Sequence, residues 1–377
     1  MCRNFNGTSE IPAKNARLQK IVGKYNSRQD IPRREDFVTI DAGFISLEEL
    51  KAPQWTVYSL DTKGAIFIEL PKPLTHYLID KYPFIFIPMF DEALRIAEMD
   101  LKTYISFGNE LENDSKSNPP PKTLFFSNTA RGASTLFGAM LQHDGHSIVY
   151  GEHPALIILS TGLKDLYWSE KDINDLLPAT IKLIRKHIPS NQLFVIKTSS
   201  TQVNLVPFLS KHFPQMQHIF MFRKNGLNSV ERVVARSFEN QILLNLYNYF
   251  PSLATFFGFL VATEGTLQRR LKPTHIKEWS MLIYAGPYMY YKQNKEIFNF
   301  PIVWHDELME NPEKLNIPEK CISNSIAKMK IDSQADTYLS QKNLKDIKMS
   351  EMTPELKQNL QKYAEILLIE PEIHGIN

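Results

Sequence analysis

"TLFFSNTARGASTLF", residues 123–137, runs from an apolar stretch into a short polar cluster and directly into a second apolar stretch. The pattern indicates a buried strand that turns into a helix. Such a turn presents unpaired backbone N–H groups and the positive end of the helix dipole, which together bind phosphate or sulfate oxygens. The cluster adds a positive charge, two small residues and two hydroxyl donors: Arg131, Gly132, Ala133, Ser134 and Thr135. On composition alone it predicts either an anion site or an ordinary strand-to-helix turn.

Short apolar runs recur along the chain after this stretch and alternate with helical segments. Including the first, they cover residues 123–127, 147–150, 193–197, 218–222 and 301–305. Such runs, separated by helices, are typical of a parallel sheet covered on both faces. The sequence therefore predicts an α/β fold with a doubly wound parallel sheet of about five strands and helices on both faces. Ligands of such folds bind beyond the carboxyl ends of the strands, so the polar residues that follow the strands are the first candidates for chemistry.

A polar, proline-rich stretch precedes this sheet. Residues 112–122, ENDSKSNPPPK, disfavour both helix and core strand. We place a domain boundary there, between an N-terminal α+β extension, residues 1–118, and the α/β domain, residues 119–377.

The extension itself shows no pattern that indicates chemistry. Residues 55–60 and 65–70 predict a hairpin, and the apolar spacing over residues 90–107 predicts a helix. The cluster YPFIFIPMF, residues 82–90, is expected to serve packing rather than function.

Composition limits the classes of partner and compartment. The 43 basic and 41 acidic residues of the 377-residue chain give a net charge of +2, so no global field favours nucleic acid or an anionic membrane. Only Cys2 and Cys321 are present, which excludes a disulfide framework and a cysteine-based metal site. The chain begins without an apolar signal segment, and no apolar run reaches the roughly 18 residues of a membrane span. We expect a soluble, cytoplasmic protein without a nucleic-acid partner or a membrane span.

Two other classes of site are disfavoured by spacing. His305, Asp306 and Glu307 are adjacent and cannot easily converge on one ion, so no metal is expected. The loop at residues 129–135 lacks the Gly-x4-Gly-Lys-Ser/Thr pattern, which disfavours a nucleoside triphosphatase.

Three segments together resemble the PAPS-dependent sulfotransferase family of the P-loop sulfotransferase superfamily, of which the chain would be a divergent member. TARGASTLF, residues 129–137, is similar to the loop that binds the 5′-phosphosulfate of PAPS (3′-phosphoadenosine 5′-phosphosulfate). Residues 193–234 resemble the family's strand VIKTH and its 3′-phosphate segment, and residues 301–315 resemble a late strand and helix start. Their order on successive strands makes the match specific. The resemblance implies PAPS as donor, PAP as product and no metal.

The resemblance also implies roles for individual residues. Arg131 matches the basic residue that contacts the 5′-phosphosulfate, and Lys197 matches the lysine that stabilises the transferring sulfuryl group. Arg223 matches the arginine that binds the 3′-phosphate. The family's serine in this segment falls at Glu231 here, so Ser229 is the nearest hydroxyl. The implied donor-binding set is Arg131, Gly132, Ala133, Ser134, Thr135, Arg223 and Ser229.

The catalytic base departs from the family pattern. Cytosolic small-molecule members have histidine where this chain has Ser199, and an unaided serine cannot act as a general base. Glu152, just after the run 147–150, is the leading candidate, since the family's tyrosine and carbohydrate sulfotransferases have a glutamate there. His153 is the second candidate. For both residues a purely structural role in the loop is the alternative.

The function expected from these residues is transfer of a sulfuryl group from PAPS to a hydroxyl or amine of a small, lipophilic acceptor. Apolar segments between residues 238 and 295 either line the acceptor pocket or belong to the core. The alternatives are a catalytically inactive nucleotide-binding protein on the same fold and a phosphotransferase related to P-loop kinases. The partners expected are the small-molecule acceptor and, for self-association, a second copy of the chain in a homodimer.

Overall fold

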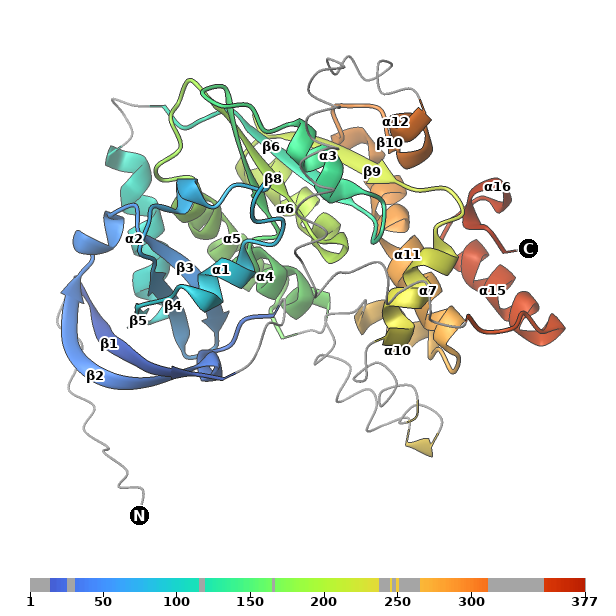
Figure 1. Cartoon of the computed structure of the whole chain (residues 1–377), viewed down its shortest axis with the longest axis horizontal. Coiled ribbons are helices and arrows are strands. Elements are labelled where there is room, and N and C mark those ends of the chain that lie inside the picture. Colours follow the sequence, from blue (N-terminus) through green and yellow to red (C-terminus); the bar gives the residue numbers. More distant parts are fainter. Residues whose placement is uncertain are drawn as a thin grey trace.

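The computed structural model describes residues 14–25, 31–114, 119–164, 167–236, 245, 249–250, 265–310 and 349–376. It contains an antiparallel sheet, at the left in Figure 1, a parallel sheet in the centre, and a group of helices at the right. Most of the segment 238–264, part of the expected acceptor pocket, lies outside the described residues.

All five strands predicted for the parallel sheet are confirmed. They are β6 (Thr123–Asn128), β7 (Ser147–Gly151), β8 (Leu193–Lys197), β9 (Gln217–Phe222) and β10 (Val303–Trp304). Their order in the sheet is β10-β9-β6-β8-β7, and every pair is parallel. β6 is therefore central, between β8 and β9. After β6 the chain forms β7 and β8 on one side of it, and it then crosses to the other side to form β9 and β10. The direction of the connections therefore changes beside β6.

Helices cover both faces of this sheet, as the uninterrupted apolar runs predict. The connecting helices are α3 (Ser134–Met140), α4 (Pro154–Lys164), α5 (Glu170–Ile184), η5 (Ser200–Leu205) and α6 (Val206–His212). Phe125 and Phe194 lie in one hydrophobic cluster with residues of α4 and α5. Phe126 and Val195, which point to the opposite face, lie in another with residues of α3. Alternate side chains of each strand are thus buried on opposite faces.

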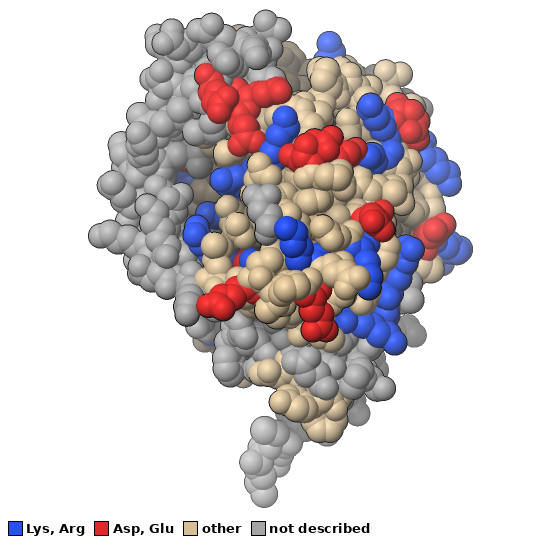
Figure 2. Space-filling view, turned by 90° about the vertical axis from the view of Figure 1, so that its right-hand side faces the viewer, with Lys and Arg blue, Asp and Glu red and all other residues tan. Residues whose placement is uncertain are grey.

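A helical group extends the first of these faces beyond β9. It consists of α7 (Leu227–Arg236), α10 (Gly265–Leu271), α11 (Ile276–Gln293), α15 (Pro354–Ile366) and α16 (Pro371–His374). α12 (His305–Glu310) follows β10 on the opposite face, where Leu308 lies in the cluster of Phe126 and Val195. Phe220 and Phe222 of β9 pack against α11, where their rings contact those of Tyr288 and Tyr291. On this side of the molecule acidic and basic residues are interspersed among neutral ones (Figure 2).

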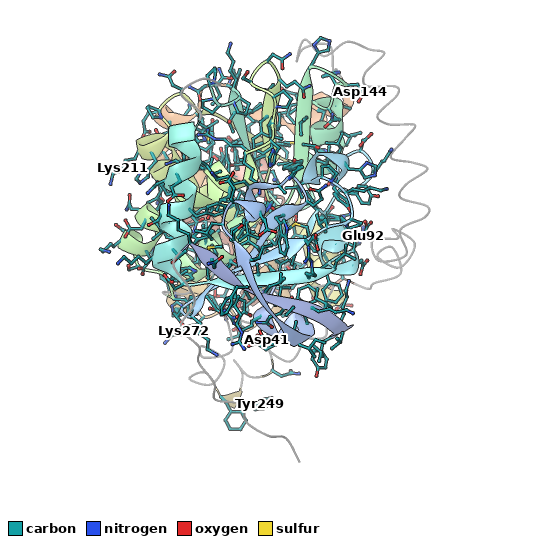
Figure 3. All side chains as sticks on the ribbon, turned by 90° about the vertical axis from the view of Figure 1, so that its left-hand side faces the viewer. Asp41, Glu92, Asp144, Lys211, Tyr249 and Lys272 are labelled. Carbon is teal, nitrogen blue, oxygen red and sulfur yellow. The ribbon has the colours of Figure 1, made fainter. Side chains whose placement is uncertain are left out.

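The N-terminal sheet has five antiparallel strands in the order β2-β1-β5-β4-β3. They are β1 (Asn15–Lys24), β2 (Phe37–Ser46), β3 (Trp55–Asp61), β4 (Gly64–Glu69) and β5 (Arg95–Met99). The predicted hairpin is confirmed as β3 and β4. Figure 3 shows the molecule from this sheet's side, with Asp41 of β2 near the bottom and Asp144, before β7, near the top.

The prediction of one continuous helix over residues 90–107 is wrong, because the middle of this range forms a strand. The chain forms α1 (Phe86–Asp91), strand β5 and then α2 (Leu101–Asp114). β5 pairs with β1 on one side and with β4 on the other. Pairing with two strands far away in the sequence therefore overrides the local periodicity. Short 3-10 helices complete the described elements: η1 (Arg34–Asp36), η2 (Glu49–Lys51), η3 (Leu74–His76) and η7 (Lys295–Ile297).

The two sheets share one hydrophobic cluster. It contains Val57 of β3, Phe107 of α2 and residues of α4 and α5, and it continues to Ile196 of β8. α4 and α5 thus pack against both the antiparallel and the parallel sheet (Figure 1). The division at residues 118 and 119 stays a prediction.

A segment of the N-terminal region, residues 79–86, lies along the edge strand of the parallel sheet; we call it the strap. The backbone N–H of Ile79 donates to the carbonyl of Val149 (3.1 Å), and that of Ile85 donates to the carbonyl of Gly151 (2.8 Å). The outer edge of β7 is therefore covered at these positions. Across the described part of the chain, no helix is both long and apolar enough to span a membrane.

Candidate functional site

The register of the parallel sheet brings the residues that follow four strands to one edge. Lys197, the last residue of β8, is paired with Phe126 of β6 and with Gly151 of β7. Asn128, the last residue of β6, is paired with Met221 of β9. Polar groups that follow β6, β7, β8 and β9 are therefore neighbours. A carboxyl edge where the connections change direction is where ligands bind in open α/β sheets.

The loop after β6 is fixed from several sides. The backbone N–H of Thr129 donates to the carbonyl of Met221 (3.1 Å), and its hydroxyl donates to the carbonyl of Tyr284 on α11 (2.8 Å). The side-chain amide of Asn128 donates to the carbonyl of Thr198, after β8 (2.6 Å). The loop is thus held against both neighbouring strands and the helical group.

Two residues of this loop adopt a left-handed backbone. Arg131 and Ala133 have φ angles of 61° and 60°, on either side of Gly132. Such conformations are costly for residues with a side chain and occur where the surroundings enforce them. Successive backbone N–H groups in turns of this kind form concave anion-binding sites. The N–H of Gly132 itself donates to the carbonyl of Thr129 (3.3 Å), and Ser134 and Thr135 lie in the first turn of α3. The two left-handed residues are the feature that this loop shares with such sites.

The side chain of a second arginine, Arg223, reaches this loop. The guanidinium of Arg223, after β9, donates to the backbone carbonyl of Arg131 (3.3 Å). Loss of solvation and the nearby positive charge of Arg223 lower the pKa of Arg131. Neither arginine pairs with a carboxylate among the residues that the structure describes. Two like charges without a counterion are relieved by an anion between them.

Tyr284 supports both arginine-bearing loops, although the sequence did not single it out. Its hydroxyl lies 2.8 Å from the carbonyls of Arg223 and of Ile373, and its own carbonyl accepts from Thr129. Burial is the main cause that raises its pKa. It lies in an apolar segment for which the sequence left both a core and a pocket role open, so only the fold reveals this contact.

Lys197 and Glu152 form an ion pair at the ends of β8 and β7. The lysine ammonium donates to Oε1 of Glu152, and the two side chains are 2% and 13% exposed. The backbone N–H of Glu152 also donates to the carbonyl of Lys197 (2.7 Å), and Glu152 has a φ of 49°. Oε2 of Glu152 accepts no hydrogen bond from a described residue. The carboxylate therefore keeps one oxygen for a further donor.

Lys197 is enclosed by α3 and the strap. Gly138 of α3 lies over its side chain, because a Cβ at Gly138 would be 3.5 Å from Cγ of Lys197. The lysine ammonium lies 5.6 Å from the centre of the Phe84 ring, which belongs to the strap. The sequence missed Phe84 as a site residue, since it lies in the cluster at residues 82–90 that was expected to serve packing.

His153, the second candidate for the base, is completely buried. Burial lowers its pKa to about 3. Its Nδ1 accepts a hydrogen bond from the backbone N–H of Ala155 (3.3 Å), so the proton of the neutral ring is on Nε2. Nε2 of the neutral ring already carries a proton, and the lone pair of Nδ1 is engaged by Ala155. Neither nitrogen is therefore well placed to accept a proton from an acceptor molecule. These features favour Glu152 over His153 as a proton acceptor.

The positions that depart from the family pattern have structural partners. The hydroxyl of Ser199 lies 3.0 Å from that of Thr201, at the start of η5. Glu231 is buried and bonded to Lys277 of α11 (2.6 Å). Ser229 lies in the first turn of α7, where its N–H donates to the carbonyl of Gly226 (2.9 Å), and no described hydrogen bond joins it to Arg223.

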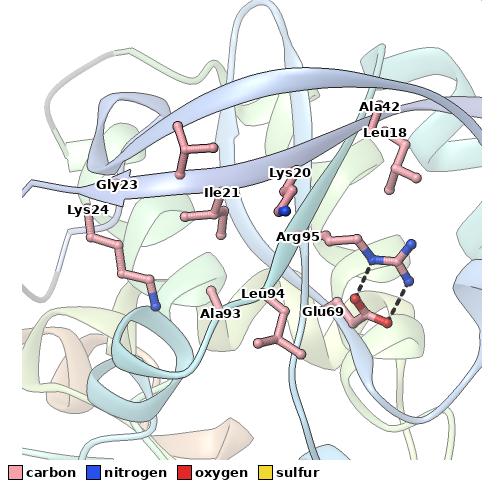
Figure 4. Close-up of a pocket in the computed structure, with 11 residues that line it drawn as sticks. Leu18, Lys20, Ile21, Gly23, Lys24, Ala42, Glu69, Ala93, Leu94 and Arg95 are labelled. Atoms are coloured by element: carbon pink, nitrogen blue, oxygen red, sulfur yellow. Dashed lines mark hydrogen bonds and ion pairs between the residues drawn. The ribbon is translucent and has the colours of Figure 1, made fainter.

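A separate hollow of about 840 Å³ lies on the antiparallel sheet (Figure 4). Its polar groups are largely engaged: Arg95 donates to Glu69 at 2.5 and 2.7 Å, and Lys24 donates to the carbonyls of Phe90 and Asp91 at 2.9 and 2.7 Å. None of the residues predicted for the site lines it. The hollow is therefore distinct from the carboxyl edge of the parallel sheet.

Comparisons with known proteins give little beyond this geometry. No protein-family model matches the sequence, and no curated protein matches it significantly. The structure is similar to the crystal structure of a sulfotransferase from Alicyclobacillus acidocaldarius, with a TM-score of 0.32 and 10% sequence identity. The alignment covers 67% of this chain and 97% of that one. At this TM-score and identity the similarity carries no argument about function, and we base the function on the residues at the carboxyl edge.

Proposed function

We propose that the protein transfers a sulfuryl group from PAPS to a hydroxyl or amine of a small, lipophilic acceptor. One observation carries this proposal. Arg223 reaches the backbone of Arg131 in the loop after β6, and neither arginine has a carboxylate partner among the described residues, while the pair Lys197–Glu152 ends the two strands on the other side of β6. An anion-binding centre thus adjoins a carboxylate that can take a proton.

The donor nucleotide carries two anionic ends, and the residues fit both. The loop, with Arg131 and the residues Gly132, Ala133, Ser134 and Thr135, would hold the 5′-phosphosulfate. Arg223 would bind the 3′-phosphate, for which a guanidinium fork is suited, because it donates two parallel hydrogen bonds. Ser229 would add a hydroxyl at the start of α7. Burial and, after it, the nearby charge of Arg223 lower the pKa of Arg131, and the ligand's negative charge would offset both.

The transfer is a single in-line displacement. Glu152 accepts the proton of the acceptor's hydroxyl or amine while the oxygen or nitrogen forms a bond to sulfur. The bond from sulfur to the bridging oxygen breaks, and its electron pair leaves with PAP. Arg131 and Lys197 stabilise the charge that develops on the bridging and equatorial oxygens. Preorganised donors of this kind contribute about 3 kcal/mol each.

Calorimetry tests the donor site. We expect PAP to bind tightly without magnesium, and ATP to bind weakly. Transfer from labelled PAPS to a panel of phenols, alcohols and amines then tests the reaction. Absence of PAP binding would overturn the proposal, and tight ATP binding that needs magnesium would instead favour the kinase-like phosphotransferase.

A catalytically inactive nucleotide-binding protein is the second candidate. It is favoured by the ion pair that already engages Glu152 and by the hydrogen bond that engages the hydroxyl of Ser199, at the family's histidine position. Tight PAP binding without turnover across the acceptor panel would support it. A cytoplasmic location and a homodimer also stay predictions.

A further inference from the structure

The strap is fitted closely to the end of β7. A Cβ at Gly151 would lie 2.1 Å from the carbonyl oxygen of Pro83 in the strap, so only glycine allows this approach. The carbonyl of Gly151 accepts from Ile85 of the strap (2.8 Å). The next residue after Gly151 is Glu152. The strap and the candidate base are therefore attached to the same turn.

Ile79 anchors the other end of the strap. It is 1% exposed and packs in the cluster of Val149 and Val195, on the α3 face of the parallel sheet. Its Cδ1 would be only 2.6 Å from a Cβ at Gly138 of α3. The strap is thus held by hydrogen bonds to β7 at both ends and by packing under α3.

Phe84 lies between these attachment points and is partly exposed. Its ring centre is 5.6 Å from the ammonium of Lys197, and it also contacts the ring of Phe86 (5.7 Å between centres). Lys197 in turn bonds to Glu152. An apolar ring from the N-terminal region therefore adjoins the charged pair that we assign to the transfer.

We propose that the strap forms a wall of the sulfuryl-transfer site and that Phe84 contacts the acceptor beside its reacting group. This inference rests on the proposed function. An acceptor whose hydroxyl reaches Oε2 of Glu152 must place its body next to this pair. A partly exposed ring there favours an acceptor with a planar apolar face adjoining the hydroxyl, because stacked or edge-to-face ring contacts stabilise it. The N-terminal region is then part of the active site and selects the acceptor.

The experiment compares Phe84→Ala with Phe44→Ala. Phe44 is a more exposed phenylalanine of the N-terminal region (42%) that lies on β2, away from the parallel sheet. With 2-naphthol as acceptor, Phe84→Ala should raise KM at least tenfold. We expect its Kd for PAP and its KM for a small aliphatic alcohol to stay within twofold of the wild-type values. Its midpoint of urea denaturation should be unchanged. Phe44→Ala should change none of these.

A second variant tests the strap itself. Gly151→Ala should displace Pro83 and raise KM for 2-naphthol, while Gly23→Ala, whose Cβ would make only ordinary contacts at 3.5 Å to Val38, should not. An unchanged KM for 2-naphthol in Phe84→Ala overturns the inference and leaves the proposed function intact. If the wild type binds PAP but does not turn over, binding of 2-naphthol to the PAP-loaded protein replaces KM as the readout. Failure of the wild type to bind PAP overturns the proposed function instead.

Discussion

The ion pairs Lys197–Glu152 and Lys277–Glu231 both contain a buried lysine, yet their carboxylates are satisfied to different extents. Glu231 is 1% exposed, and each of its oxygens has a partner: Lys277 on Oε2 (2.6 Å) and the N–H of Ser350 on Oε1 (2.9 Å). Glu152 is 13% exposed, has a left-handed backbone and bonds to Lys197 through Oε1 alone. A closed pair of this kind holds helices together, whereas an open one can take up a further proton donor.

The two pairs also differ in the backbone that surrounds them. Lys277 and Glu231 lie between α7 and α11, in regular helix, and Asn228 also accepts from the lysine (3.4 Å). Lys197 and Glu152 lie where strands end, beside a loop with further left-handed residues. Strained backbone is retained where the surroundings enforce it, and it gathers at functional sites. The comparison therefore favours a structural role for Lys277–Glu231, and it agrees with the chemical role that we propose for Lys197–Glu152.

The largest expected effect is on turnover, in Glu152→Gln. Glutamine keeps the size of the side chain and an oxygen for Lys197 but cannot accept the acceptor's proton. Turnover should fall by about 10²–10⁴-fold, the usual contribution of a general base. Measurement of kcat with saturating PAPS checks this. Glu69→Gln, which breaks the pair with Arg95 on the antiparallel sheet, should leave kcat unchanged.

If Glu152→Gln retains wild-type kcat, Glu152 is not the general base. The different exposure of the two carboxylates would then have no relation to catalysis.

The next effect is on stability, in Glu231→Gln. This change leaves the charge of Lys277 buried and uncompensated, so the free energy of unfolding should fall by about 3–5 kcal/mol. Urea denaturation measures it. The double variant Glu231→Leu with Lys277→Met should recover most of the loss, because an apolar pair removes both charges. Glu370→Gln provides the control, since its pair with Lys292 is about one third exposed and contributes about 1 kcal/mol or less.

A loss in Glu231→Gln no larger than in Glu370→Gln would show that the closed pair is not a stabilising element.

A third effect concerns Arg131, in the loop after β6. Arg131→Ala removes the charge proposed to steady the bridging oxygen, so kcat should fall roughly a hundredfold. The free energy of unfolding should stay the same or rise slightly, because the nearby charge of Arg223 no longer has a like-charged neighbour. Arg17→Ala, on β1 and paired with Asp41, is the matched control. Wild-type turnover in Arg131→Ala would mean that the loop after β6 is wrongly assigned.

Much of this arrangement could be predicted from local sequence. The five parallel strands are continuous apolar runs, and each is followed by a polar residue. Since parallel strands end at a common edge, the sequence predicts that Arg131, Glu152, Lys197 and Arg223 lie at the same edge of the sheet. The contact between the two arginine loops agrees with that expectation.

Other features depend on pairings that no local pattern contains. β5 is a strand because β1 and β4 flank it, although its apolar spacing suits a helix. Phe84 reaches Lys197 only because the strap bonds to carbonyls of β7, more than sixty residues later in the chain. Glu231 stands where the resemblance to sulfotransferases would place a serine, and only the fold shows that it pairs with Lys277.

The smallest expected effect is on the pH dependence of stability, in His153→Asn. Together with turnover it distinguishes the two neighbouring candidates for the base, Glu152 and His153. In the folded protein burial lowers the pKa of His153 to about 3, from an ordinary value of 6.5. Between these values the unfolded chain binds a proton that the folded protein does not, so this histidine's contribution to stability is complete above pH 6.5 and is lost as the pH falls toward 3. In His153→Asn, the amide oxygen can accept from Ala155 as Nδ1 does, but it does not titrate.

Urea denaturation from pH 7 to pH 4 should therefore show a shallower loss of stability in His153→Asn than in the wild type. His218, whose pKa burial lowers to about 4, titrates in both proteins, so its contribution cancels in the comparison. Turnover at pH 7 should remain within a few-fold of wild type, because His153 is enclosed and its Nδ1 already has a donor. A loss of turnover in His153→Asn as large as in Glu152→Gln, with stability unchanged, would move the base from the carboxylate to the imidazole.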